Sequence, residues 1–217
     1  MTLKILNLYA GIGGNRKLWT GDIEVTAVEI NPKIAKIYQD FFPNDKVIVT
    51  DAHQFLLEHF KEFDFIWSSP PCPTHSKIRM FSAVARGQNK PLFPDMKLYE
   101  EILFLQGNFK GKWVVENVIG WYEPLIKPNK VGNHYYWTNF PLTNIESESR
   151  QHDGTIEELQ KRKGFDLSKY KNLKIDKKLL LRNCVEPNEA LHIFEMAFKE
   201  PQLTLLEQKG GLNSSQP

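Results

Sequence analysis

Short runs of β-branched and aromatic residues alternate with helical stretches over the first 120 residues, and this alternation restricts the possible folds more than any other feature. Strands are predicted near 4–9, 24–29, 46–50, 63–68 and 112–117, and helices near 14–20, 32–42, 52–60 and 95–107. Strands and helices that alternate in this way form βαβ units, which build a mostly parallel sheet with helices on both faces. The sequence therefore predicts an α/β fold.

The first predicted strand runs into a glycine-rich turn, LNLYAGIGG, which ends at Gly14. Such a turn lets the backbone approach a ligand closely at the edge where open α/β sheets bind cofactors. The next two strands end in Glu29 and Asp51, which would accept hydrogen bonds from ribose hydroxyls and from an adenine amino group. The alternatives are a plain βα turn, a solvated strand end and a helix N-cap. These features suit a nicotinamide dinucleotide as well as S-adenosylmethionine.

The fourth and fifth strands carry the residues that separate these two chemistries. The fourth ends in Pro70-Pro71-Cys72, which places a thiol in a stiff loop at the carboxyl edge of the sheet. The fifth ends in Glu116-Asn117-Val118, and a carboxyl group that follows an apolar run has a raised pKa and is suited to act as a general acid. A buried, unreactive cysteine and a surface salt-bridged glutamate are the alternatives.

Taken together and in order, LYAGIGG, AVEIN, Asp51, PPC with Ser76 four residues later, and ENV resemble the motifs of the cytosine-C5 DNA methyltransferases. The resemblance covers residues 4–141 and resumes at Asn183-Cys184-Val185. It implies a Rossmann-like S-adenosylmethionine-dependent methyltransferase fold and transfer of a methyl group to carbon 5 of cytosine. In that chemistry Cys72 adds to carbon 6 of the base while Glu116 protonates nitrogen 3.

The resemblance also implies which residues bind the two substrates of such a reaction. The expected S-adenosylmethionine contacts are Tyr9, Ala10, Gly11, Gly13, Gly14, Glu29, Ile30, Asp51, Ala52, Pro70, Asn183 and Val185. The expected contacts to the nucleic acid are Ser76, Asn117, Val118 and His134.

Several positions depart from the pattern of that family. Gly132 and His134 stand where arginines that contact the base and the DNA backbone are expected, so His134 or Lys130 would have to substitute, unless His134 is a surface histidine on a strand. Arg182 replaces the glycine that usually precedes Asn183. Further differences, which do not touch the core reaction, are Asn7, Asn15, Asn31 and Pro73.

The region that usually selects the target is short in this chain. We expect a catalytic and cofactor-binding domain at 1–145, a basic target-recognition segment at 146–182, a returning C-terminal helix within 183–208 and a flexible tail at 209–217. Nine Lys and Arg residues between Lys161 and Arg182 face four acids between Glu157 and Arg182. Such a segment would bind phosphates without reading sequence, and a solvated charged helix is the alternative.

Composition narrows the remaining possibilities. The chain has 217 residues, a formal net charge of +2 and two cysteines, which belong to no zinc-binding pattern, so no metal is expected. Its apolar runs are shorter than the roughly 20 residues of a membrane span, and the N-terminus does not resemble a signal peptide. We therefore expect a soluble cytoplasmic protein. The resemblance to the cytosine-C5 methyltransferases further implies an enzyme of phage or restriction-modification type in a bacterial or phage-infected cell.

The residues leave three alternatives to a DNA methyltransferase. They are an RNA cytosine-C5 methyltransferase, an impaired or partner-dependent DNA-binding subunit, and a nicotinamide-dependent oxidoreductase. The oxidoreductase leaves PPC and ENV unexplained, and an intact pair of Cys72 and Glu116 argues against a subunit without activity.

Overall fold

The computed structural model describes residues 1–77, 80–81, 93–143 and 154–199, and the statements below concern these residues. Its strands are β1 (Leu3–Leu8), β2 (Ile23–Val28), β3 (Lys46–Ile48), β4 (Phe65–Ser68), β5 (Lys112–Val118), β6 (Asn129–Val131) and β7 (His134–Thr138). Its helices are α1 (Pro32–Phe41), α2 (Ala52–His59), α4 (Lys97–Asn108), α5 (Ile156–Lys163), α6 (Lys177–Arg182) and α7 (Pro187–Phe198). Short 3-10 helices are η1 (Asn15–Leu18), η2 (Phe60–Glu62) and η3 (Ser168–Leu173).

The strands form one seven-stranded sheet in the order β3-β2-β1-β4-β5-β7-β6. The strands from β3 to β5 pair in parallel, whereas β7 runs antiparallel to both β5 and β6. Five parallel strands therefore bring their carboxyl ends to one edge. This arrangement confirms the predicted Rossmann-like α/β fold with a mostly parallel sheet.

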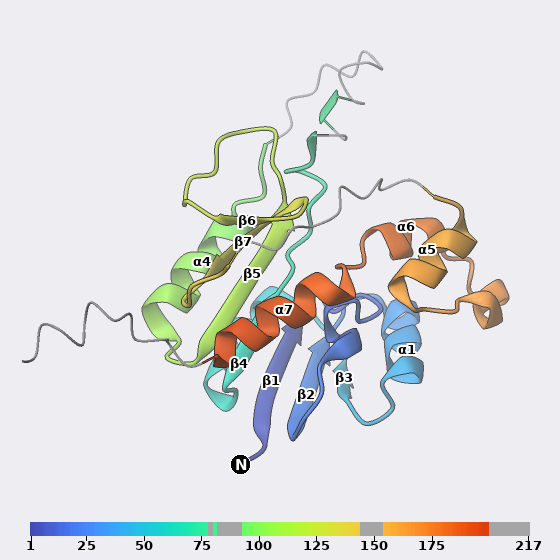
Figure 1. The fold of residues 1–217 in the computed structure, drawn as a ribbon, viewed down its shortest axis with the longest axis horizontal. Coiled ribbons are helices and arrows are strands. Elements are labelled where there is room, and N and C mark those ends of the chain that lie inside the picture. The colour runs from blue at the N-terminus through green and yellow to red at the C-terminus, as the bar shows by residue number, and fades with distance from the viewer. Residues whose placement is uncertain (78–79, 82–92, 144–153, 200–217) are drawn as a thin grey trace, which may run out of the picture.

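Helices cover both faces of the sheet (Figure 1). On one face, Ala190, Ile193 and Phe194 of α7 pack with Trp19, which follows η1, and with inward residues of the strands. On the other face, Leu56 of α2 and Ile102 and Leu105 of α4 pack against a second set of apolar strand residues. A sheet buried on both faces explains why the strands read as short, nearly continuous apolar runs.

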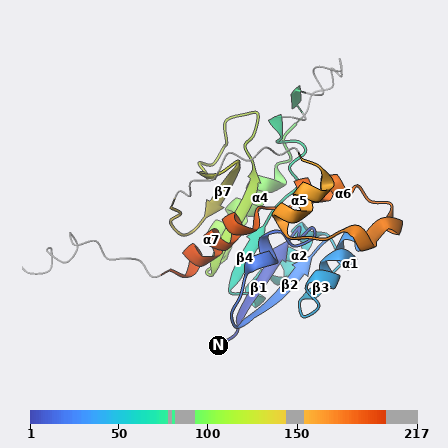
Figure 2. The same cartoon turned by 45° about the vertical axis from the view of Figure 1, so that its right-hand side comes forward.

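The described part of the basic segment, residues 154–182, folds into α5, η3 and α6, which lie beside α1 in both views (Figures 1 and 2). Residues 146–153 of the predicted segment lie outside the described residues. A capping box of Thr155 and Glu158 starts α5, and Gly164 ends it in the left-handed region. Buried residues between the helices, including Leu159, Phe165 and Leu181, give the segment an apolar core shared with α1. It is a folded unit rather than one solvated charged helix.

The structure differs from the predicted elements in a few places. The predicted helix near 14–20 is the 3-10 helix η1. The aromatic run HYYWTNFP, from His134 to Pro141, also reads as a strand, and β7 covers only its first part, His134–Thr138. The edge strand β6 was not predicted, because three residues are too few to produce a periodic pattern. The tail predicted at 209–217 and the end of the predicted 183–208 helix lie outside the described residues.

No helix among the described residues is long and apolar enough to span a bilayer. No three of their His, Cys, Asp and Glu side chains are grouped so that they could hold a metal ion.

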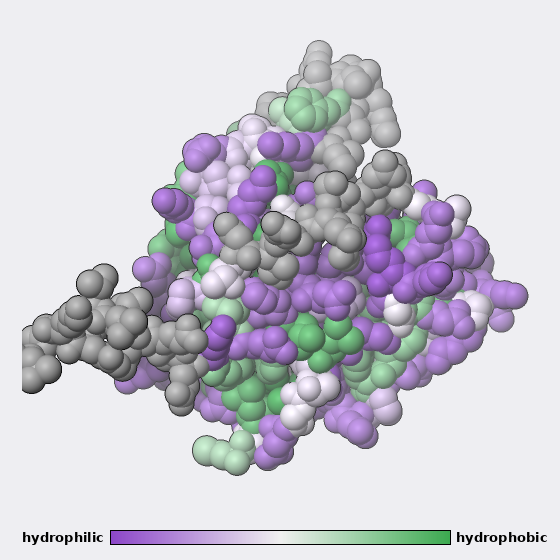
Figure 3. Space-filling model, in the orientation of Figure 1, coloured by the Kyte–Doolittle hydropathy of each residue, from purple (hydrophilic) through white to green (hydrophobic). Residues whose placement is uncertain are grey.

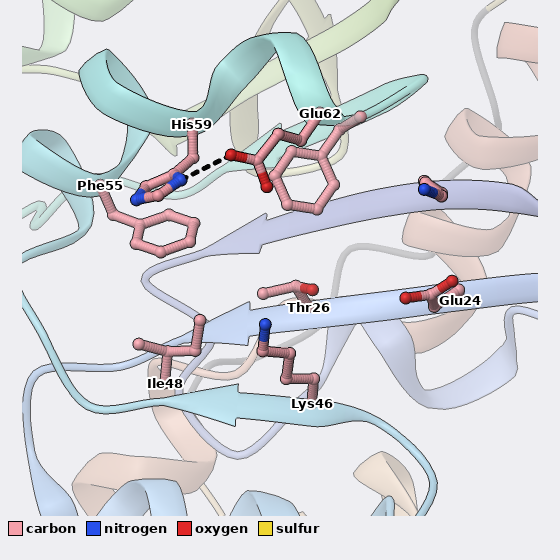
Figure 4. Close-up of a pocket in the computed structure, with 9 residues that line it drawn as sticks. Glu24, Thr26, Lys46, Ile48, Phe55, His59 and Glu62 are labelled. Atoms are coloured by element: carbon pink, nitrogen blue, oxygen red, sulfur yellow. Dashed lines mark hydrogen bonds and ion pairs between the residues drawn. The ribbon is translucent and has the colours of Figure 1, made fainter.

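A groove of about 210 Å³ runs along one face of β1, β2 and β3 beside α2 (Figure 4). Phe55 and His59 stack at one end of it, and His59 contacts Glu62 at 2.7 Å. Its lining residues are Lys4, Glu24, Thr26, Lys46, Ile48, Phe55, His59, Glu62 and Phe63. None of these is a predicted site residue, so the groove is separate from the candidate site.

Candidate active site

The predicted site residues follow the ends of neighbouring strands. Paired residues Leu8, Val28 and Ile48 end β1, β2 and β3, and Leu8 also pairs with Ser68 at the end of β4. Because these strands are parallel, the loops after them meet along one edge. The glycine-rich turn, Glu29, Asp51, the PPC loop and the end of β5 therefore lie at this edge.

The glycine-rich turn is held by the carboxylate of Glu29. One oxygen of Glu29 accepts from the backbone N–H of Gly11 at 3.0 Å, and the other accepts from that of Asn31 at 2.9 Å. Gly11 and Gly13 have φ of +56° and +87°, which favour glycine, and a Cβ at Gly11 would meet nothing within 4 Å. Each carboxylate oxygen of Glu29 has a second lone pair, so Glu29 can still accept from ribose hydroxyls.

Two neighbouring residues fit a nucleoside beside Glu29. Ile30 is 65% exposed, so its side chain is free to contact a flat base. Asp51 is exposed and caps α2 by accepting from the N–H of Gln54 at 2.9 Å. The predicted cap is confirmed, and its second oxygen is compatible with a ligand. The buried residue Ala52 begins α2.

The segment after α6 closes against the glycine-rich turn. A Cβ at Gly14 would overlap the sulfur of Cys184 and the backbone of Val185, so these chain segments are in direct contact. Cys184 is buried, and burial raises the pKa of its thiol to about 12. Asn183, at the end of α6, is exposed next to this contact. The structure thus brings Val185 to the turn, with Asn183 two residues before it.

We predict that Gly14→Ala destabilises the protein, because the added methyl group has no space. Overpacking of this kind reduces the free energy of unfolding by about 1–3 kcal/mol. Gly107→Ala is the matched control, since a Cβ at this position in α4 meets nothing within 4 Å. Gly107 is the next-to-last residue of α4, so its change to Ala should raise the free energy of unfolding by at most about 0.5–1 kcal/mol, the value for a helix interior. Urea unfolding of both variants measures the two effects, and equal stabilities would contradict the packing described.

The PPC loop is tied to the end of β5 by Asn117. The buried amide of Asn117 donates to the carbonyl oxygen of Pro70 at 3.0 Å. After Cys72 the loop turns tightly, and the backbone N–H groups of His75 and Ser76 both donate to the Cys72 carbonyl at 3.0 Å. Ser76 pairs with Gly120 in an isolated antiparallel bridge. These bonds hold partly exposed Cys72 next to the end of the strand that carries Glu116.

Glu116 is buried at this edge, with a side chain 10% exposed. Burial raises the pKa of Glu116 to about 7, and a hydrogen bond from Ser69 lowers it in part. The Ser69 hydroxyl accepts from the Trp67 indole at 3.0 Å, which leaves its proton to be donated to Glu116. Near neutral pH this carboxyl group can both hold and release a proton, as a general acid must.

His134 lies between two carboxyl groups rather than on an open surface. Its side chain is 15% exposed, with Nε2 3.7 Å from Oε1 of Glu116 and Nδ1 3.9 Å from Oε2 of Glu189 on α7. Burial lowers the pKa of His134, and the Glu189 carboxylate opposes this effect. The register explains the first contact, because His134 pairs with Val118 and Tyr136 pairs with Glu116 on the same face.

Three features of the site were missed in the sequence. Ser69 contacts Glu116, and Glu189 contacts His134, but neither Ser69 nor Glu189 belongs to a recognisable sequence motif. Lys163 was grouped with the solvated basic residues, yet it is buried, donates to the Cys184 carbonyl and pairs with Glu186 at 2.9 Å. It is not available to bind phosphate. The capping-box motif of Thr155 and Glu158 marks where α5 begins, but it does not show that Lys163 points inward.

The sequence is similar to known proteins. A family model described as C-5 cytosine-specific DNA methylase matches residues 3–120. A tRNA (cytosine(38)-C(5))-methyltransferase from Spodoptera frugiperda is 37% identical over 79 residues, which make up 33% of this chain and 24% of the relative. The matched segment therefore spans about a quarter of that relative.

Two solved structures are also similar. A variant of Spodoptera frugiperda DNMT2 gives a TM-score of 0.47 at 21% identity over 67% of this chain and 54% of the other. The Entamoeba histolytica methyltransferase EhMeth gives 0.46 at 16% identity over 73% and 60%.

The match to the family model covers more than half of the chain, from the glycine-rich turn through Cys72 and Glu116. The expected contacts to S-adenosylmethionine lie along one edge of the sheet, where Glu29 and exposed Ile30 fit a nucleoside. The chain belongs to the family of C-5 cytosine-specific DNA methylases, enzymes that transfer a methyl group from S-adenosylmethionine.

Proposed function

We propose that this protein methylates carbon 5 of cytosine in DNA through a covalent adduct of Cys72 at carbon 6. The observation that carries the proposal is the bond from Asn117 to Pro70, which fixes the loop of the thiol to the strand of Glu116. A nucleophile and an acid with a pKa of about 7 are thereby held at one sheet edge. Asn117 has a positioning role in this arrangement.

The reaction needs both residues because carbon 5 of cytosine is a poor nucleophile. The Cys72 thiolate adds to carbon 6 while Glu116 gives its proton to nitrogen 3, so that carbon 5 becomes electron-rich. S-adenosylmethionine, when bound, supplies an electrophilic methyl group. Carbon 5 takes this methyl group. A proton acceptor then removes the carbon 5 proton, which expels the Cys72 thiolate, and nitrogen 3 returns its proton to Glu116. Every bond made to the enzyme is broken again.

His134 is the residue that we assign to the place of the missing arginines. It lies 3.7 Å from Glu116, so a base that contacts Glu116 would lie within its reach. A neutral imidazole can donate one hydrogen bond to a base but adds no charge. Two further residues complete the proposed substrate contacts. Ser76 follows the PPC loop, and Val118 is the last residue of β5.

Attack from one face and methyl transfer on the other require a base outside the duplex stack. The basic segment offers a surface that could hold the backbone of such a substrate. Its outward side over α5 and α6 is hydrophilic (Figure 3), and the exposed cations are Lys161, Lys169, Lys171, Lys174 and Arg182. Contacts from these residues to phosphates carry no sequence information, which favours a short or relaxed target.

An RNA substrate is the second candidate. The similarity to a tRNA (cytosine(38)-C(5))-methyltransferase supports it, over the third of this chain that the match covers. The chemistry of Cys72 and Glu116 would be the same in DNA and RNA, so the choice depends on residues outside that pair.

Labelled S-adenosylmethionine offered with duplex DNA, single-stranded DNA and tRNA in parallel tests the proposal. Transfer to carbon 5 of cytosine in DNA supports it, whereas transfer to tRNA alone replaces it with the second candidate. No transfer to any of the three substrates contradicts both.

Binding to the substrate should depend steeply on salt if the basic segment contacts phosphates. Four phosphate contacts would weaken binding roughly 100-fold between 50 and 200 mM salt. Replacing Lys171, Lys174 and Arg182 by Gln should reduce the slope of log affinity against log salt concentration by about 3, because about 1 is lost with each phosphate contact. Fluorescence anisotropy with a labelled duplex measures both. An unchanged slope in the triple variant would place the phosphate contacts elsewhere.

A further inference from the structure

Glu101 is a fully buried carboxylate on α4 that neither the motifs nor the proposed mechanism uses. Its exposure is 0%, although it lies in a helix whose other buried residues, such as Ile102 and Leu105, are mostly apolar. A charged group in such a place is stabilised only when it is well hydrogen-bonded. Its surroundings are therefore informative.

Three side chains meet at this carboxylate. The Tyr9 hydroxyl donates to Oε1 at 2.6 Å, and the Ser68 hydroxyl donates to Oε2 at 2.5 Å. Nδ1 of His53 lies 3.0 Å from Oε1. Hydrogen bonds to a carboxylate are short and about twice as strong as those between neutral groups. Burial and the Glu101 charge also raise the pKa of Tyr9, so its phenol remains a donor.

Each partner of Glu101 comes from a different part of the active-site edge. Tyr9 belongs to the glycine-rich turn, and His53 follows Asp51 in the first turn of α2. Ser68 is the last residue of β4, four positions before Cys72. One carboxylate thus connects both loops expected to bind the cofactor with the strand that leads to the nucleophile.

The backbone at Tyr9 shows why such a connection is needed. Tyr9 has φ of +54°, a left-handed conformation that is rare for an aromatic residue. Such a conformation is unfavourable and persists only when surrounding contacts hold it. The bond from the Tyr9 hydroxyl to Glu101 is such a contact, and it fixes the residue directly before Ala10 and Gly11.

We propose that Glu101 is a positioning residue that holds the cofactor-binding turn, the start of α2 and the strand before Cys72 in one fixed arrangement. This inference rests on the proposed function, because it assigns the held loops to the cofactor and the nucleophile. Glu101 itself contacts neither. It acts through Tyr9, His53 and Ser68.

The test uses Glu101→Gln, which keeps the size of the side chain but removes the charge and leaves one good acceptor for three donors. Glu100→Gln is the matched control, since Glu100 is the preceding residue of α4, is 62% exposed and lies 3.7 Å from His53. Two readouts without turnover report on the two loops. They are titration with S-adenosylhomocysteine, the demethylated cofactor, and the alkylation rate of Cys72 by iodoacetamide, assigned with Cys72→Ala.

We expect Glu101→Gln to weaken S-adenosylhomocysteine binding roughly tenfold, as loss of a charged hydrogen bond would. The alkylation rate of Cys72 should change at least threefold, which corresponds to about 0.65 kcal/mol. Tyr9→Phe should affect mainly cofactor binding, and Ser68→Ala mainly alkylation. Combined with Glu101→Gln, neither should add a further loss. These milder variants also serve if Glu101→Gln does not fold.

Wild-type values for both readouts in folded Glu101→Gln would overturn the proposal, as would fully additive effects in the double variants. A wild-type protein that binds no S-adenosylhomocysteine would instead contradict the proposed function. The positioning role would then be decided by the alkylation rates of the Ser68 and Glu101 variants, which need no cofactor.

Discussion

Cys72→Ala is expected to abolish methyl transfer. Without the thiol no bond forms to carbon 6, so carbon 5 does not become nucleophilic and the rate falls by more than about 1000-fold. The side chain is partly exposed in its loop, and the loop is held by backbone atoms and by Asn117, so its fold should survive the change. Transfer of labelled methyl groups under single-turnover conditions measures the loss.

Cofactor binding is the control for that variant. Cys72→Ala should bind S-adenosylhomocysteine with the affinity of the wild type, because the turn and Glu29 are untouched. Methyl transfer that survives in the alanine variant would exclude Cys72 as the nucleophile, whatever the substrate.

Glu116→Gln is expected to reduce methyl transfer by about 100-fold to 10,000-fold, the usual contribution of a general acid. In the wild type the active form is protonated, and the pKa of Glu116 is about 7. Activity should therefore fall as the pH rises through 7. The glutamine variant should lose this limb of the profile, and Glu195→Gln, on the exposed side of α7, should keep it. A pH profile of single-turnover rates measures both.

The same substitution should change stability in the opposite direction. Because the folded-state pKa of Glu116 lies above its ordinary value near 4.5, the folded wild type binds a proton more tightly than the unfolded chain. The contribution of Glu116 to the free energy of unfolding therefore decreases as the pH rises from about 4.5 through 7. Glu116→Gln should be more stable than the wild type at pH 8, and this advantage should shrink toward pH 4.5. Equal pH dependence of the two proteins would show that Glu116 is not buried as a carboxyl group.

The sequence was sufficient to predict the parallel part of the sheet, because strands buried on both faces leave apolar runs bounded by glycine, proline and acids. It also placed Glu29, Asp51, Cys72 and Glu116 at strand ends, where topology alone brings them to one edge. These residues are recognisable because each stands in a short motif close to a turn. The cap at Asp51 followed from its position before a helix.

Other parts of the site depend on contacts between distant segments, which periodicity does not reveal. His134 reads as a strand residue, and its burial arises because α7 brings Glu189 against β7. Lys163 reads as one of nine basic residues, but the fold of α5 turns it toward Glu186. Glu101 had one detectable signal, an acid at a position of α4 that follows the apolar residue Leu98 by one helical turn.

A covalent complex with an oligonucleotide that contains 5-fluorocytosine tests the central claim most directly. After addition of Cys72 and methyl transfer, fluorine at carbon 5 cannot leave as a proton, so the thiol stays attached to carbon 6. We predict a complex that survives denaturing electrophoresis, requires S-adenosylmethionine and maps to Cys72 by mass spectrometry. A wild-type protein that methylates ordinary cytosine but forms no adduct, or an adduct that maps to another residue, would contradict the account.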